Sequence, residues 1–504
     1  MKVHLLYPNR DFDHELEPQP ENASLINDLE LSTLFKAMAR EDRFILDIVK
    51  KGILNELHDL SEIKYRQDVL SDCLEFPLVI KQLYQIPIQI MEIKRKNWLL
   101  LSSRNPTGLL RTSVKLLQSY LKLLGTLNQI ATEFSEKFQS QGFKRFFQMI
   151  QTELSESYLT KMRMQLKELR FDKGILVSVK LGKGGEGTDY ILRQRIEEDT
   201  PWVKRIFEKN NPSFSFNLHP RDDAGANALE ALRNRALKQV AVSVAQSADH
   251  IDSFFAVLRR ELAFYLGCIN LAEKLEELNE PITFPRAVSS QEKRYEFQGL
   301  YDICLALTMQ KTVVGNDIAS KGKNLVMVTG PNQGGKSTFL RSLGLSQVMM
   351  QCGMFVPANS FVANISTGIF THFKREEDGS MSSGKLDEEL TRMSKIVDRV
   401  TPNSLILFNE SFASTNEYEG SEIAFQIVKA MLEKNIKVIF VTHMYSLSHK
   451  LYEEEKDNIL FLRAGRQADG KRTFRMNEEK PLATSFGKDL FEKMFSGKPS
   501  VLNQ

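Results

Sequence analysis

The hydrophobic pattern changes character near residue 300. Before this point, apolar residues recur at the three- and four-residue spacings of amphipathic helices. After it, short apolar runs rich in β-branched and aromatic residues alternate with helical stretches, as in a parallel α/β sheet. The sequence therefore predicts a multidomain chain in which an all-α part precedes an α/β part.

The first hundred residues predict an extended arm and then a helical core. The arm, to about residue 25, is rich in proline and acidic residues. Several medium helices are expected from residue 27 to about 94, with Pro77 and Pro87 as breaks because proline removes a backbone donor.

Two long helical segments come next along the chain. One covers residues 109–169 and is loosened near Gly125 and Gly142; the other covers residues 223–278. A helix of about 50 residues would extend about 75 Å at about 1.5 Å per residue. Length of this kind without caps indicates coiled-coil-like lever arms.

A β-rich stretch separates the two arms. Its runs at 174–180 and 188–193 are joined by Gly182, Gly184 and Gly187 in the spacing G-x-G-x-x-G. No helix is expected after these glycines, so a hairpin turn is favoured over a dinucleotide site. Basic side chains gather there among acids, at Lys173, Lys180, Lys183, Arg193, Arg195, Lys204 and Arg205. A solvated hairpin and a surface for phosphate backbones both fit this pattern.

The α/β part contains a phosphate-binding sequence. Residues 330–337 read G-P-N-Q-G-G-K-S, which fits G-x-x-x-x-G-K-[ST], between a buried-strand run at 324–328 and a helical pattern. Backbone N–H groups at such a junction suit a polyphosphate, with Lys336 on the β- and γ-phosphates and Ser337 on Mg²⁺. The predicted nucleotide-binding residues are Gly330, Pro331, Asn332, Gly334, Gly335, Lys336, Ser337 and Thr338.

Two further strand ends carry candidate catalytic groups. The run 404–408 leads directly into Asn409 and Glu410, and the run 437–441 ends two residues before His443. Open α/β sheets bind their ligands at the carboxyl ends of strands. We expect Glu410 to polarise the attacking water, His443 to sense the γ-phosphate and Asn409 to assist the metal, where an aspartate is usual. His372, which we place on another strand, is a weaker candidate.

A polar segment offers a second anion site. Ser382 or Ser383 precedes Gly384 at a predicted helix start, where backbone N–H groups are free. Beside a phosphate loop, this segment suggests a composite pocket that Ser383 of one subunit completes in another.

Composition narrows the class of protein. At 504 residues, with 42% hydrophobic and 26% charged residues, the chain suits two to four domains. A net charge of +3 neither favours nor excludes nucleic acid. The four cysteines lack metal-type spacing, and no signal peptide or membrane-length apolar run is found. A cytoplasmic protein with no membrane contact is expected.

Together these segments resemble the MutS proteins of DNA mismatch repair, whose ATPase domain belongs to the ABC superclass. The run 329–338, T-G-P-N-Q-G-G-K-S-T, matches the family's phosphate loop except at Gln333, where methionine is usual. Residues 351–358 look like A-Q-I-G-x-F-V-P-A, and 441–443 like A-T-H. Residues 409–415 stand where D-E-x-G-R-G-T is expected, and 482–487 resemble the terminal T/S-S/Y-G element.

The resemblance is looser elsewhere. Ser383 falls on the serine of the trans-acting S-T-F-M-x-E motif, and Glu388 on its glutamate, although Gly384 replaces the threonine. Because only about 25 residues precede the helical core, the family's mismatch-reading and connector domains are expected to be absent. Asn409 predicts weakened Mg²⁺ affinity or slow turnover.

These observations predict the domain boundaries. The expected domains are an extended arm at 1–25, a helical core at 26–108, lever helices at 109–170, a β clamp tip at 171–218, a returning lever at 219–295 and a P-loop ATPase domain of the ABC type at 296–504.

The resemblance implies a DNA-binding ATPase. A homodimer would use ATP and Mg²⁺ at its ATPase interface to open and close on duplex or structured DNA, with a repair protein as a further partner. The alternative is an ATP-gated switch with slow hydrolysis that grips a protein or ribonucleoprotein. A chromosome-structuring ABC ATPase fits the arms, but neither the 355–358 nor the 442–444 segment.

Overall fold

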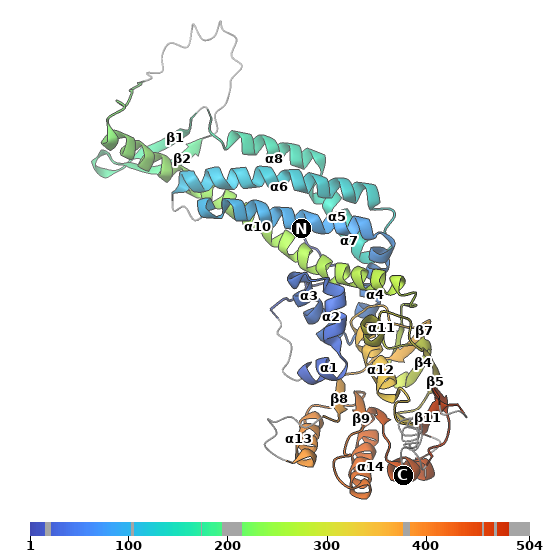
Figure 1. Cartoon of the computed structure of the whole chain (residues 1–504). Helices are drawn as coiled ribbons and strands as arrows, with labels where there is room; N and C mark the ends of the chain where they lie inside the picture. The colour runs from blue at the N-terminus through green and yellow to red at the C-terminus, as the bar shows by residue number, and fades with distance from the viewer. Residues whose placement is uncertain are drawn as a thin grey trace, which may run out of the picture. The chain divides into compact units, whose positions relative to one another are not determined.

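The computed structural model describes residues 1–15, 22–101, 105–172, 174–193, 214–375, 384–455, 458–467 and 471–482. It divides into two compact units (Figure 1). The arm unit holds residues 1–3, 81–138 and 144–259, and the base unit holds residues 4–80, 139–143 and 260–504. Among the described helices, none combines the length and apolarity needed to cross a bilayer.

Three helices contribute residues to both units: α5 (Pro77–Leu101), α7 (Gln141–Glu153) and α10 (Asp223–Glu277). The arm unit adds α6 (Pro106–Phe134), α8 (Glu156–Glu168), β1 (Leu176–Leu181), the 3-10 turn η1 (Lys183–Gly185) and β2 (Gly187–Arg193). The predicted helix at 223–278 is confirmed as α10.

Polar contacts join the helices within the arm unit. The Tyr120 hydroxyl of α6 donates to Asp252 of α10 over 2.8 Å, and Lys94 of α5 pairs with the same carboxylate. Nearer the start of α6, the Thr107 hydroxyl donates to Asn234 of α10 over 2.7 Å. Partly buried hydrogen bonds to charged groups are among the stronger ones, so these contacts fix the packing of α5 and α6 against α10.

The sequence pattern misplaced some helix ends. Residues 109–169 form three helices. Helix α6 continues through Gly125 without the expected loosening, whereas the first break, between Phe134 and Gln141, lies directly before Gly142. The backbone N–H groups of Gln139 and Ser140 donate to Asp72, which fixes the turn before α7. Pro87 lies inside α5 and does not end it. Tertiary packing outweighs the cost of a proline inside this helix, and the spacing of apolar residues in the sequence gives no sign of that packing.

The glycine-rich stretch forms a hairpin, as predicted. Strands β1 and β2 pair antiparallel, from Leu176 opposite Arg193 to Leu181 opposite Gly187. The last of the three glycines, Gly187, opens strand β2 and not a helix, which favours the hairpin turn over a dinucleotide site. Lys173, Arg195, Lys204 and Arg205 lie outside the described residues.

The base unit combines helices and two sheets. Its helices are α1 (Asn22–Asp28), α2 (Leu31–Ala39), α3 (Arg43–Leu54), α4 (Leu60–Glu75), α11 (Ile303–Met309), α12 (Lys336–Gln351), α13 (Lys385–Val397), α14 (Glu417–Glu433) and α15 (Tyr445–Glu455), with the 3-10 turn η2 (Ser290–Glu292). Strands β3 (Arg286–Val288), β7 (Ser360–Asn364), β4 (Arg294–Leu300) and β5 (Asn316–Lys321) form a mixed sheet in that order.

The second sheet has the order β12-β11-β6-β10-β9-β8. Its strands are β12 (Arg472–Glu478), β11 (Ile459–Arg466), β6 (Leu325–Thr329), β10 (Lys437–Val441), β9 (Leu405–Asn409) and β8 (Ile369–Phe373). All neighbours pair parallel except β11 with β12. The three predicted buried strands are therefore confirmed as adjacent β6, β10 and β9.

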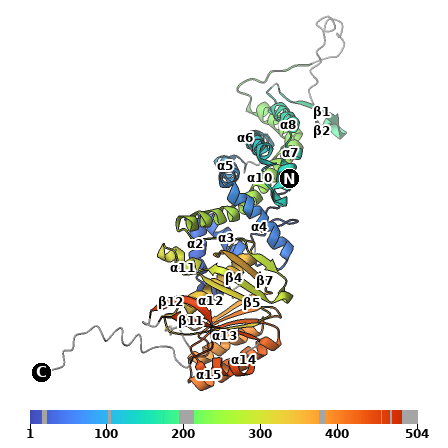
Figure 2. The ribbon, with the colours of Figure 1, turned by 90° about the vertical axis from the view of Figure 1, so that its right-hand side faces the viewer.

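Helices cover both faces of this sheet. Ile406 and Phe408 of β9 belong to a buried cluster with α14 and α15 on one face (Figure 2). Leu407 points to the other face, where its side chain meets Gly344 of α12. Because strand residues alternate between faces, the continuous apolar run of β9 is what a strand between two helical layers requires. The parallel strands end at one edge, and that edge carries the candidate site.

Candidate nucleotide site

The loop between β6 and α12 is shaped by its glycines. Gly330 and Gly335 have φ values of 118° and 85°, which side-chain-bearing residues rarely adopt. A Cβ atom on Gly334 would lie 2.8 Å from the carbonyl oxygen of Pro331. The loop therefore follows a tight path that side chains at these glycine positions would obstruct.

The first turn of α12 begins at Lys336, directly after this loop. A helix start leaves the N–H groups of its first residues without intrahelical acceptors, and the helix dipole favours an anion there. The Lys336 ammonium lies 3.1 Å from the carbonyl oxygens of both Gly330 and Pro331 and donates to them. Burial lowers the pKa of Lys336, while the nearby Glu410 carboxylate acts in the opposite direction. One ammonium group and the N–H end of a helix thus lie beside the same loop, which fits a polyphosphate.

Ser337 and Asn409 meet across neighbouring elements. The Ser337 hydroxyl of α12 donates to Asn409 Oδ1, at the end of β9, over 3.0 Å. These two oxygens can hold Mg²⁺ only weakly by themselves because neither is charged. In the described part of the chain, no three His, Cys, Asp or Glu side chains gather into a metal cluster. A Mg²⁺ ion that takes most of its ligands from phosphate and water would fit this arrangement.

Glu410 and His443 stand beside each other at the ends of β9 and β10. The His443 Nδ1 atom lies 3.7 Å from a carboxylate oxygen of Glu410. This imidazole lowers the pKa of Glu410, and the charges of Lys336 and Lys374 add to the effect against partial burial. The side chain of Glu410 is 31% exposed. An ionised carboxylate within reach of solvent can accept a proton from water.

The backbone after β9 is strained. Glu410 and Phe412 have φ values of 52° and 63°, in the left-handed region. For residues with side chains this conformation costs roughly 1–2 kcal/mol each. Phe412 stands where the family motif has its first glycine, so the chain departs from the motif where glycine would relieve the strain. Burial of its ring, which is 0% exposed, offsets the cost by roughly 1.5–3 kcal/mol.

A cavity of about 440 Å³ adjoins the phosphate loop. Its lining comes from the turn between β4 and α11, α11 itself, the segment that leads into β5 with the start of that strand, the phosphate loop, α12 and β12. It includes Tyr301, Val313, Asn316, Gln333, Thr338 and Phe474. Asn316 links two of these parts, because its Oδ1 accepts from Met476 N over 2.7 Å. The hydroxyl of Tyr301 is buried and has no hydrogen-bond partner among the described residues. The volume and the apolar walls suit a nucleoside.

Sequence reasoning missed this cavity. Tyr301, Asn316 and Phe474 come from three separate segments and belong to no phosphate-binding pattern. The only signal was Gln333, which departs from the family's phosphate loop and lines the cavity.

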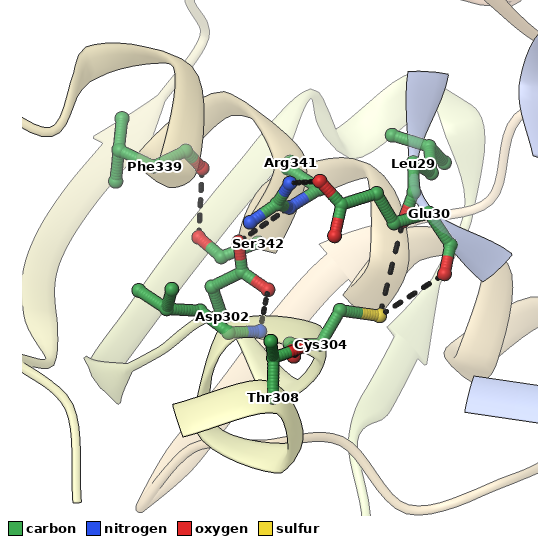
Figure 3. A network of polar contacts seen from close by, with 9 residues as sticks. Leu29, Glu30, Asp302, Cys304, Thr308, Phe339, Arg341 and Ser342 are labelled. Atoms are coloured by element: carbon green, nitrogen blue, oxygen red, sulfur yellow. Dashed lines mark hydrogen bonds and ion pairs between the residues drawn. The ribbon is translucent and has the colours of Figure 1, made fainter. Parts of the chain in front are cut away.

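A polar network ties α12 to its surroundings (Figure 3). Arg341 pairs with Glu30 and with Asp302, whose carboxylate oxygen lies 2.5 Å from Arg341 Nε. Asp302 also caps α11 by accepting from Leu305 N over 3.0 Å. Burial raises the pKa of Asp302 and Arg341 opposes that rise. The network connects the phosphate-loop helix, one wall of the cavity and the turn between α1 and α2.

The structure brings most of the predicted groups together. Lys336, Ser337, Asn409, Glu410 and His443 meet at one sheet edge. Ser383 lies outside the described residues, as do residues 483–487. Gly384 is described as the residue before α13 and makes no side-chain cap. His372 lies on β8, as expected, but is buried.

A phosphate loop on a parallel sheet, with polar strand ends beside it, defines a P-loop α/β protein. Comparison with known proteins is more specific. The family model described as MutS2 N-terminal domain matches residues 58–278, and the one described as MutS domain V matches residues 326–500. The chain belongs to the MutS family.

Individual relatives agree with this assignment. The chain is 30% identical over 201 residues to MutS protein homolog 4 of Mus musculus, which covers 38% of this chain and 21% of that protein. It is 35% identical over 145 residues to the DNA mismatch repair protein MutS of Prochlorococcus marinus, covering 28% of this chain and 16% of the relative. The chain thus spans about a fifth of the length of the curated relatives it matches.

Proposed function

We propose that this protein binds and hydrolyses ATP at the edge formed by β6, β9 and β10. The observation that carries the proposal is the Ser337–Asn409 hydrogen bond beside the glycine loop, because it joins the phosphate cradle to the strand that bears Glu410. ATP is favoured by the phosphate loop and the adjoining cavity together, which match the triphosphate and the nucleoside.

Each residue has a distinct proposed role. The loop N–H groups and Lys336 hold the phosphates and stabilise charge that develops on them. Glu410 orients the attacking water and takes its proton. His443 keeps the Glu410 carboxylate ionised, and the same imidazole contacts the γ-phosphate. Ser337 and Asn409 would hold Mg²⁺ directly or through water, and a bound ion would neutralise phosphate charge. Because Asn409 adds no negative charge, we propose slow turnover.

The site is proposed to be shared between two copies of the chain. The helix start at Ser383 and Gly384 would supply the second anion-binding group in trans. Dimerisation would then assemble two pockets at one interface, and ATP would stabilise the closed pair.

The arm unit is proposed to close on DNA. In this scheme the levers are residues 109–170 and 219–295, of which 139–143 and 260–295 belong to the base unit. Residues 171–218 are a tip that contacts phosphates through Lys180, Lys183 and Arg193. Nucleotide state would shift the population between open and closed arms. Backbone contacts of this kind make binding dependent on salt and weakly dependent on sequence. A role in repair is proposed because relatives are named as DNA mismatch repair proteins. A role in recombination and a further repair protein as partner belong to the same proposal.

The decisive experiment measures ATP turnover of the full chain with no DNA and with duplex, junction and single-stranded DNA at low salt. We expect binding of at least one form and a change in turnover. Absence of both with every form would reject the DNA-dependent ATPase.

A second function is favoured by Asn409: an ATP-gated switch that grips a protein or ribonucleoprotein and turns over little. Glu410→Gln separates the two. If the parent hydrolyses ATP no faster than this variant, and its dimer is equally long-lived, the switch is the better account.

A further inference from the structure

The segment after β9 holds a conformation that it would not adopt alone. Glu410 and Phe412 both have left-handed backbones, at φ values of 52° and 63°. The Glu410 N–H donates to Val441 O over 2.8 Å, which fixes the start of the segment on β10. Further along, a Cβ atom on Gly420 would lie 2.2 Å from the carbonyl oxygen of Phe412. Neighbouring elements must therefore stabilise the turn that aims the Glu410 side chain.

His372 supplies that stabilisation from β8. Its Nδ1 lies 2.8 Å from the Ser411 hydroxyl oxygen, and the same hydroxyl contacts the His372 carbonyl oxygen. The imidazole also stacks on the ring of Phe412, with centroids 5.2 Å apart and planes 16° apart. His372, Ser411 and Phe412 are all 0% exposed. Two of the three residues that begin the turn are thus held by one side chain.

The second ring nitrogen of His372 reaches α13. Nε2 lies 3.0 Å from the carbonyl oxygen of Glu389, which can only accept, so this nitrogen carries the proton. Burial, with Arg392 nearby, lowers the pKa of His372 to about 4, and the ring is neutral near pH 7. Nδ1 is then unprotonated, and it shares the single proton of the Ser411 hydroxyl with the His372 carbonyl oxygen, to which that hydroxyl donates. The orientation of the ring is fixed from both sides.

We propose that His372 is a positioning residue for Glu410: it holds the turn at Ser411 and Phe412 and couples that turn to α13. The inference rests on the proposed function, since it assigns His372 a task in the reaction of Glu410. His372 does not touch the nucleotide; it acts through the backbone that it locks. A shift of α13 would reach the Glu410 carboxylate through the Glu389–His372–Ser411 contacts.

The first measurement is hydrogen exchange of residues 410–415 in the nucleotide-free full chain. His372→Asn and Ser411→Ala are expected to speed exchange there, while Thr371→Val, on the adjacent position of β8, leaves it unchanged. Unaltered exchange in both lock variants, in proteins with the parent's melting temperature, would overturn the proposal without reference to ATP.

The second measurement is a kinetic cycle. His372→Asn is expected to lower kcat by roughly ten- to a hundred-fold, because small misplacements of a catalytic group have effects of this size. The Kd for ATP should stay within about twofold, since no phosphate contact is lost. In a Glu410→Gln background the same substitution should cause no further loss.

The outcomes distinguish the two proposals. An equal loss with and without Glu410, or a loss only of ATP affinity, means that His372 supports the fold generally, and the positioning role is wrong. If the parent shows no turnover at all, the proposed hydrolysis fails, and the exchange measurement alone decides whether His372 holds the turn.

Discussion

Two glycine-rich loops of this chain look alike as sequence and differ as structure. Gly330 and Gly335 lie between a buried strand and the first turn of α12. Gly184 and Gly185 lie between two exposed strands of a hairpin. All four have positive φ values. In both loops the glycines therefore allow the positive φ angles that the turn requires.

The two loops differ in the element that each one leads into. A helix start concentrates free N–H groups and a favourable dipole at one point, whereas a hairpin uses its N–H groups on the partner strand. The phosphate loop is also closed in by β11 and β12, since Gly330 approaches Ala464 and Gly335 approaches Phe474. Among the described residues, no atom lies within 4 Å of a Cβ placed on Gly184. Anion binding is thus a property of the junction and not of the glycines.

The largest expected effect is the loss of ATP binding when the lysine of the phosphate loop, but not that of the hairpin, is replaced. Lys336→Ala should weaken ATP binding by about a hundredfold, or ~3 kcal/mol, because a buried charge on the phosphates is lost. Lys183→Ala in the hairpin should leave ATP binding unchanged and reduce the salt dependence of DNA binding. Fluorescent-nucleotide titrations and DNA binding at several salt concentrations check this. If the two variants weakened ATP binding equally, the proposed difference between the phosphate loop and the hairpin would be wrong.

A smaller effect is expected from the glycines themselves. Gly335→Ala and Gly184→Ala impose similar backbone strain, at φ values of 85° and 79°. At Gly335 the new methyl group would also lie 3.3 Å from Phe474 Cδ1, at the edge of the cavity. We expect roughly tenfold weaker ATP binding for Gly335→Ala, or ~1.4 kcal/mol, and none for Gly184→Ala. Calorimetric titration of both variants measures it.

The third prediction concerns the strand end that completes the phosphate loop and has no counterpart in the hairpin. Asn409→Asp places a negative charge 3.0 Å from the Ser337 hydroxyl oxygen in the present geometry. Mg²⁺ affinity and turnover should rise several-fold, because carboxylate oxygens are the stronger Mg²⁺ ligands. Turnover measured against Mg²⁺ concentration tests this, with Asn416→Asp as the control. A fall in both would show that Asn409 serves another purpose.

The smallest expected effect concerns the acid limb of the pH profile, which is the pH range in which turnover falls as Glu410 becomes protonated. The lowered pKa of Glu410 keeps its carboxylate ionised below the ordinary value of 4.5. The stabilising contribution of this group is therefore complete above pH 4.5 and is lost as the pH falls through the folded-state pKa. His443→Ala should move the limb to higher pH, whereas His449→Ala should not. Turnover and unfolding measured from pH 3 to pH 7 would show whether the limb stays in place.

The sequence predicts the site better where the chemistry is local. The loop, Ser337 and the strand ends at Asn409 and Glu410 are short, contiguous patterns, and a parallel sheet brings its strand ends to one edge. The cavity could not be predicted in this way, because Tyr301 and Phe474 become neighbours only through tertiary packing. The sequence pattern places His372 on the correct strand, but nothing in its local sequence indicates that it stacks on Phe412.

Helix boundaries show the same limit. Periodicity located α10 because its apolar positions recur without interruption. It failed at Pro87, where packing keeps the helix intact, and after Phe134, where a distant carboxylate, Asp72, fixes the next turn. Local patterns carry no information about such remote partners.

The Arg341 network has a consequence for how this chain can diverge. The Asp302 side chain is 0% exposed. Loss of Arg341 alone would leave its buried charge without a partner and lower the free energy of unfolding by roughly 3–5 kcal/mol. Replacing Arg341 and Asp302 together by apolar residues of similar volume would cost far less. Substitutions at positions 30, 302 and 341 should therefore be inherited as a set among close relatives, so that covariation marks the joint between the phosphate-loop helix and the helical base.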